Sequence, residues 1–169
     1  DWAELASRLR DTPGLPDLAA EVAALKGIRP DVPRLLTDTG RRPAVVDAEG
    51  VDAPYILRAA GRDGLDRVNT WFKEYHVTLS VVSRGDYFEI LAAGTSDEPV
   101  SLLDSGAGLG QALPLVVQAL LARHMPALWC IEQPELHLHP RAHAGIGDLL
   151  VGVVERHPGT RLLVETHSD

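Results

Sequence analysis

Two short apolar runs in the last third of the chain predict buried strands. They cover residues 127–131 and 161–165, and each is bounded by turn residues or charges. Residues 140–156 lie between them and carry a helical pattern, with Pro140 at the start, where proline is tolerated. A strand, a helix and a second strand at this spacing predict a β–α–β unit with parallel strands.

Polar side chains follow both runs directly. Glu132, Gln133 and Glu135 come after the first, and His167 comes after the second. The carboxyl ends of parallel strands meet at one rim of a sheet, where α/β proteins bind ligands. We therefore expect these four side chains to share a site.

The pattern upstream is more mixed. Apolar residues at helix-face spacing predict a broken helical segment over 1–26, carried by Trp2, Leu5, Leu9, Leu18, Val22 and Leu25. Further helices are predicted at 53–61, 66–73 and 111–123, the last with Pro114 in its first turn. Strands are predicted at 44–46, 76–82, 87–91 and 100–103.

These elements predict an α/β fold built on a parallel sheet, with a mixed α+β lobe at the N-terminal side. We divide the chain into a helical or irregular segment at 1–62, a helix with a β-hairpin at 63–99, and a third segment at 100–169 that carries the predicted site. Because the sequence begins without Met and stops just after a strand, we expect it to be part of a longer protein.

Composition narrows the class of protein. The 24 acidic residues outnumber the 16 Lys and Arg, which gives a net charge of −8 and argues against broad electrostatic binding of nucleic acid. The single cysteine, Cys130, lies inside an apolar run and is expected to be a buried thiol. With no disulfide framework and no apolar run near 18 residues, we expect a cytoplasmic protein that does not span a membrane.

The acids after the first strand suit a hard cation. Mg²⁺ prefers oxygen ligands, so Glu132 at a strand end is a candidate magnesium carboxylate. Gln133 cannot act as a strong base, but it can orient an attacking water by hydrogen bonding. Glu135 is a candidate base or a contact to a partner subunit. The alternative is that Glu132 and Glu135 lie on a solvated loop.

Histidines are concentrated in the same region, with six of the seven at or after His124. His137, His139 and His143 with Glu132 are compatible with a zinc or manganese cluster. The alternative is a loop that contacts a second subunit or a nucleotide. His167 follows a strand, where an imidazole can reach a terminal phosphate or an attacking water.

A glycine-rich turn at 104–111 precedes a predicted helix. Its amides and the helix N-terminus form a candidate anion site, contributed by Ser105, Gly106, Gly108, Gly110 and Gln111. The turn does not fit the Gly-x-Gly-x-x-Gly pattern, and the sequence contains no Gly-x-x-x-x-Gly-Lys-Ser/Thr phosphate loop. A serine-hydrolase reading would use Ser105, His167 and Asp169, but no Gly-x-Ser-x-Gly elbow supports it.

Three segments, in this order, resemble the C-terminal half of an ABC-type ATPase head. They are Asp-Ser-Gly-Ala-Gly-Leu-Gly-Gln at 104–111, Ile-Glu-Gln-Pro-Glu-Leu-His-Leu-His-Pro at 131–140 and Glu-Thr-His-Ser-Asp at 165–169. The chain is similar to bacterial AAA-domain ATPases of the OLD, RecF and SMC-like group. The match covers about residues 100–169, and residues 44–92 resemble the family's insert more loosely.

The resemblance implies a parallel-sheet P-loop NTPase half-domain that uses ATP and Mg²⁺. Glu132 would be the Walker B magnesium carboxylate, Gln133 would stand where many relatives carry a catalytic Glu, and His167 would be the switch histidine. Residues 105–111 would form the signature that meets the nucleotide of the opposite subunit, and residues 135–139 the dimer-interface loop.

The resemblance also implies partners: a homodimer around nucleotide, coupled to a nuclease or another effector that handles DNA, in DNA repair or phage defence. Two departures matter. Gly110 stands where relatives carry a signature Ser, and the Walker A half is absent from the sequence. Together with Gln133 they favour the alternative of a non-catalytic scaffold derived from such a head.

Overall fold

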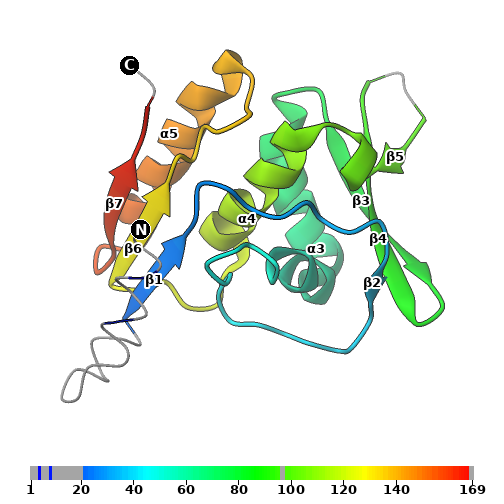
Figure 1. Cartoon of the computed structure of the whole chain (residues 1–169), viewed down its shortest axis with the longest axis horizontal. Helices are drawn as coiled ribbons and strands as arrows, with labels where there is room; N and C mark the ends of the chain where they lie inside the picture. The colour runs from blue at the N-terminus through cyan, green and yellow to red at the C-terminus, as the bar shows by residue number, and fades with distance from the viewer. Residues whose placement is uncertain (1–3, 5–7, 9–20, 96–97, 168–169) are drawn as a thin grey trace.

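The computed structural model describes residue 4, residue 8, residues 21–95 and residues 98–167. This part of the chain forms a parallel sheet and an antiparallel sheet, with α3 and α4 between them (Figure 1). The strands are β1 (Val22–Leu25), β2 (Leu36–Thr37), β3 (Thr78–Arg84), β4 (Tyr87–Ala93), β5 (Val100–Ser101), β6 (Leu128–Glu132) and β7 (Arg161–Glu165). The helices are α3 (Ala53–Lys73), η1 (Leu102–Asp104, a 3₁₀ turn), α4 (Ala107–Leu121) and α5 (Pro140–Arg156). The predicted α/β class is confirmed.

The parallel sheet has the order β1–β6–β7, and α5 connects its last two strands. β6 lies in the middle and is buried on both faces. Trp129 and Ile131 join the main core, whereas Cys130 packs on the opposite face against Val22 and Ala24. The predicted β–α–β unit and the buried thiol are both confirmed.

The N-terminal helix prediction is wrong over residues 21–26, whereas residues 4 and 8, the other described positions of this segment, are helical. Val22 and Leu25 lie in β1, which pairs in parallel with β6 in the register Val22 with Leu128 and Leu25 with Ile131. Pairing with a buried strand overrides local helix-face spacing. Trp2, Leu5, Leu9 and Leu18 lie outside the described residues.

The antiparallel sheet is built on the predicted hairpin, with β3 and β4 turning at Gly85, where φ is 67°. β2 and β5 also pair with β4. Alternate residues of β4, Phe88, Ile90 and Ala92, point into the core. The strand predicted at 44–46 is wrong, because there the Val46 amide donates to Gln118 Oε1 (2.7 Å) instead of to a strand.

The two helices predicted at 53–61 and 66–73 are one element, α3, which is kinked at Gly61. Gly61 has φ 64° and ψ −154°, a conformation open to glycine and costly for other residues. The boundary that we drew after residue 62 therefore falls inside a helix. One core cluster includes residues from α3, α4, α5 and both sheets.

α4 begins at Ala107, four residues before its predicted start, so Pro114 lies inside the helix and not in its first turn. The helix packs against both α3 and α5, and every residue from 110 to 119 is buried. This all-round burial compensates for the hydrogen bond that proline removes. No helix in the described ranges is both long and apolar enough to cross a bilayer.

Candidate functional site

The ends of β6 and β7 lie side by side, as the parallel pairing requires. Glu132 is paired with Glu165 in the ladder, and the Gln133 amide donates to the Glu165 carbonyl (2.7 Å). Gln133 has φ 44°, so the chain turns sharply as it leaves β6. A non-glycine residue in this region is uncommon and is often found at functional sites.

Glu132 and Gln133 are half-buried and present oxygen atoms at this rim. The Gly27 amide, from the loop after β1, donates to Glu132 Oε2 (3.3 Å). A carboxylate and an amide oxygen on consecutive residues are the donor type that Mg²⁺ accepts. Glu132 therefore fits the predicted magnesium carboxylate, and Gln133 lies next to it, where its amide can orient a water.

Glu135 joins the loop after β6 to the loop after β7. Its Oε1 accepts from Thr166 Oγ1 (2.8 Å) and from the His167 amide (2.9 Å). Partial burial acts to raise the pKa of Glu135, but the hydrogen bonds from His167, from its own amide and from Thr166 outweigh it and hold the pKa below its usual range. An ionised carboxylate with a lowered pKa is a weak base, so its geometry suits positioning better than proton abstraction.

The backbone of His167 is fixed while its imidazole is exposed, with 73% of the side chain accessible. Its Nε2 lies 3.9 Å from Glu165 Oε1. Glu135 thus places the histidine at the rim that carries Glu132 and leaves the ring open to solvent.

The glycine turn lies against the loop that follows β6. At Gly108 an added Cβ would come within 2.6 Å of the His137 carbonyl oxygen, so only glycine permits this approach. His137 itself has a φ of 63°. Ser105 Oγ donates to the Leu102 carbonyl (2.7 Å), and Gly106 takes φ 100° just before α4 begins.

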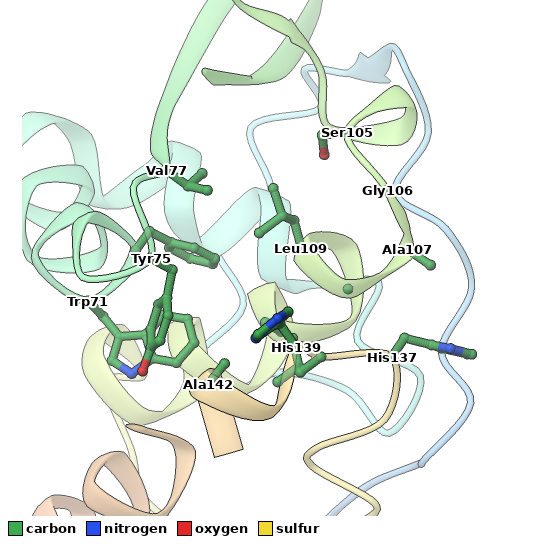
Figure 2. A pocket seen from close by; sticks show the side chains of 14 residues that line it. Trp71, Tyr75, Val77, Ser105, Gly106, Ala107, Leu109, His137, His139 and Ala142 are labelled. Atoms are coloured by element: carbon green, nitrogen blue, oxygen red, sulfur yellow. The ribbon is translucent and has the colours of Figure 1, made fainter. Parts of the chain in front are cut away.

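A cavity of about 470 Å³ lies between the glycine turn, the end of α3 and the loop that carries His137 and His139 (Figure 2). Its lining includes Trp71, Tyr75, Ser105, Gly106, Gly108, Leu109, His137 and His139. Glu132 and Gln133 do not line it. The glycine turn and the strand-end acids therefore belong to adjacent surfaces and do not share this cavity.

Gly110 and Gln111, the last two members of the predicted anion site, are buried in α4. Gln111 Oε1 accepts from the Arg29 amide (3.2 Å), and its Nε2 donates to the Arg29 carbonyl (2.7 Å). The structure therefore brings Ser105, Gly106 and Gly108 to the turn surface and places the Gln111 side chain beneath it.

The histidine cluster does not form a metal site. His139 caps α5, where its Nδ1 accepts from the Arg141 amide (3.2 Å), and His143 Nε2 lies 3.4 Å from the Leu138 carbonyl. Among the residues that the structure describes, no three His, Cys, Asp or Glu side chains are grouped to hold a metal ion. The zinc or manganese alternative is wrong for this part of the chain, because these rings serve local backbone contacts.

The serine-hydrolase alternative lacks the required contact between serine and histidine, because Ser105 Oγ donates to the Leu102 carbonyl and not to an imidazole. Asp169 lies outside the described residues.

Sequence reasoning missed three participants: Gly27, Arg29 and Thr166. The Gly27–Glu132 and Arg29–Gln111 contacts join residues 105 and 82 positions apart, and no local pattern reports them. The available signal was Gly27 itself, because a glycine often marks a place where the backbone approaches another group closely.

A family model describing an AAA domain, AbiEii toxin-like, of type IV toxin–antitoxin systems matches residues 28–169. A comparison with curated proteins returned no match. The matched range includes the glycine turn and both strand ends, and the α/β fold agrees with a P-loop NTPase-type domain. The chain belongs to this family of AAA-type, nucleotide-binding ATPase domains.

Proposed function

We propose that the chain forms part of an ABC-type ATPase head that binds and hydrolyses ATP with Mg²⁺. The observation that carries the proposal is the pair of hydrogen bonds from Thr166 and His167 to Glu135. These bonds hold a histidine beside a strand end that carries a carboxylate and an amide, Glu132 and Gln133. Membership of an AAA-domain family supports the same class of activity.

In this proposal each rim residue has one role. Glu132 holds Mg²⁺, directly or through water, and the ion neutralises phosphate charge when bound. Gln133 orients the attacking water through its amide, and His167 contacts the terminal phosphate. Glu135 positions His167 through the two hydrogen bonds that its Oε1 accepts, and its lowered pKa makes it a weak base.

The glycine turn serves the opposite subunit of a homodimer. Gly106 and Gly108 offer backbone amides near the N-terminus of α4, where an anion is stabilised, whereas the Ser105 amide donates to the Leu102 carbonyl (3.3 Å). Residues 135–139 approach this turn, as the Gly108–His137 contact illustrates, so both segments lie on one candidate interface.

The phosphate loop of this head lies, in our proposal, outside the 169 residues, because the sequence has no Gly-x-x-x-x-Gly-Lys-Ser/Thr. The chain alone is then expected to bind ATP weakly or not at all by calorimetry. Micromolar affinity of this chain for ATP would contradict the division of the head.

We further propose that the complete head works in the cytoplasm and drives a nuclease or another effector in phage defence or DNA repair. The toxin–antitoxin description of the family supports a defence role. The net charge of −8 supports contact with DNA through a partner instead of through this chain.

ATP turnover in the complete protein tests the proposal. Glu132→Ala and His167→Ala should each lower turnover on the order of 100-fold, because each removes a group that acts on transferring phosphate. Glu155→Ala, an exposed carboxylate on α5, is the matched control and should leave turnover unchanged. Full activity of both site variants would overturn the assignment.

A non-catalytic scaffold is the second candidate, favoured by Gln133 in the position expected for a catalytic Glu and by Gly110 in place of a signature Ser. The complete protein decides between the two. If it carries a phosphate loop and assembles with its partners but does not hydrolyse ATP, the scaffold function holds.

A further inference from the structure

The loop from Lys26 to Arg29 lies between the buried side of α4 and the rim of β6. On the helix side, both backbone groups of Arg29 bond the Gln111 side chain, at 3.2 Å for the amide and 2.7 Å for the carbonyl. Gln111 is 5% exposed and Arg29 is 3% exposed, so this pair of bonds is shielded from water. A paired, buried amide contact of this kind fixes a loop strongly, because breaking it leaves polar groups unsatisfied.

On the rim side, the same loop contacts both strand-end residues. The Gly27 amide donates to Glu132 Oε2 (3.3 Å), and a Cβ at Gly27 would lie 3.1 Å from Gln133 Oε1. Glycine therefore lets the loop backbone lie directly against the two side chains. Any displacement of the loop would move the groups that define the rim.

The Arg29 guanidinium adds an electrostatic attraction between this loop and the acidic residues of the rim. Its Nη1 donates to the Lys26 carbonyl (2.8 Å), while Nε and Nη2 are buried without a hydrogen-bond partner in the described part of the protein. Burial lowers the pKa of Arg29 to about 10, and the charges of Glu132 and then Glu135 act in the opposite direction. At neutral pH the group stays cationic, so it attracts both carboxylates toward the loop.

We propose that Gln111 is a positioning residue that fixes Glu132 and Gln133 through the loop from Lys26 to Arg29. α4, which begins at the glycine turn, is then coupled to the end of β6. A shift of α4 moves Arg29 and Gly27, and with them the Glu132 carboxylate. The inference rests on the proposed function for its consequence in ATP turnover, but the linkage itself is a property of these 169 residues.

The chain offers a matched control, Gln118. It lies seven residues after Gln111, about two turns along the same face of α4, and is 1% exposed. Its Oε1 accepts from the Val46 amide (2.7 Å), and its Nε2 donates to Met125 Sδ (3.7 Å). It anchors a different segment, around Val46, which meets the loop from Lys26 to Arg29 only at its start, where the Lys26 amide donates to the Ala48 carbonyl (2.8 Å).

The test compares Gln111→Met with Gln118→Met, since methionine keeps the volume and removes the hydrogen bonds. In isotope-labelled samples of the 169-residue chain, Gln111→Met should shift the Gly27 amide and Glu132 carboxyl resonances. It should also speed hydrogen exchange at Gly27 by at least about tenfold, through loss of the anchoring bonds. Gln118→Met should change these signals less, while lowering the free energy of unfolding to a similar extent.

Manganese gives a second readout, because the ion substitutes for Mg²⁺ and broadens nearby resonances. Broadening at Glu132 and Gln133 should require a higher Mn²⁺ concentration in Gln111→Met than in Gln118→Met. In the complete protein, Gln111→Met should lower kcat about tenfold with KM within twofold, because it misplaces the catalytic groups without removing a substrate contact.

Unchanged Gly27 and Glu132 signals in Gln111→Met, or equal changes in both variants, would overturn the positioning role. This failure is distinct from failure of the proposed function, which would be seen as normal ATP turnover in Glu132→Ala. If Gln111→Met unfolds the chain, Gln111→Glu provides the test. It retains an acceptor for the Arg29 amide and loses the donor to its carbonyl, so an intermediate shift at Gly27 is expected, and no shift would contradict the proposal.

Discussion

The centre of one sheet and the edge of the other differ in how completely they are enclosed. In β4, the central strand of the antiparallel sheet, alternate residues are 3% exposed or less. In the parallel sheet the central strand β6 is equally buried, but the edge strand β7 is mostly exposed, with Leu163 and Val164 each 38% accessible. The candidate site lies where β6 ends beside β7, so the buried central strands provide stability while the open edge presents chemistry.

The largest effect should come from the enclosed strand β4. Phe88 is fully buried and meets Tyr55 edge-to-face, with ring centroids 5.6 Å apart. Phe88→Ala should cost about 3–5 kcal/mol in the free energy of unfolding, measured with urea. Leu163→Ala in β7 should cost less than about 1 kcal/mol, because little buried surface is lost. Similar costs for the two variants would contradict the contrast between β4 and β7.

The next effect concerns the contact between the glycine turn and the loop after β6. Gly108→Ala places a methyl group 2.6 Å from the His137 carbonyl and should cost about 1–3 kcal/mol by overpacking. Gly110→Ala is the control, since nothing lies within 4 Å of its Cβ position. It should be neutral or stabilising by up to about 1 kcal/mol from helix propensity. The free energy of unfolding from chemical denaturation tests this. No loss of stability in Gly108→Ala would show that the glycine turn and the loop after β6 are not in close contact.

The smallest effect concerns Glu135, whose hydrogen bonds are exposed to solvent. Glu135→Gln should cost about 0.5–1 kcal/mol at pH 7. The sign of the pH dependence follows from the lowered pKa of Glu135: its stabilisation is complete above the pKa of the unfolded chain and is lost as pH falls through the folded value. The wild-type chain and the variant should therefore converge in stability in acid. A difference that persists at pH 2 would argue for another cause.

The sequence predicted elements well wherever local pattern and tertiary packing agree. α5 and β7 match their predicted bounds, and β6 is displaced by one residue. The predictions succeed here because the two apolar runs between turn residues are strands and because Pro140 begins the helix. The candidate acids and His167 were expected at adjacent strand ends, and Glu132, Gln133 and Glu165 are joined there by the β6–β7 pairing.

Prediction from the sequence failed where contacts between residues far apart in the sequence determine the local structure. Val22 and Leu25 have helix-face spacing, yet β6 recruits them into a strand. Gln111 was predicted at the anion site from its place in the glycine turn, but its side chain is committed to the Arg29 backbone, 82 residues away in sequence. No local rule shows which backbone groups a buried amide will satisfy.

The exposed outer side of β7 has a practical consequence for the purified chain. Among the described strands β7 pairs only with β6, so its other edge presents unpaired N–H and C=O groups next to Leu163 and Val164. Such an edge is a template for strand addition by another molecule. Concentrated samples should therefore form intermolecular β-structure and lose monomer with time, and a charged residue at position 163 should slow that loss.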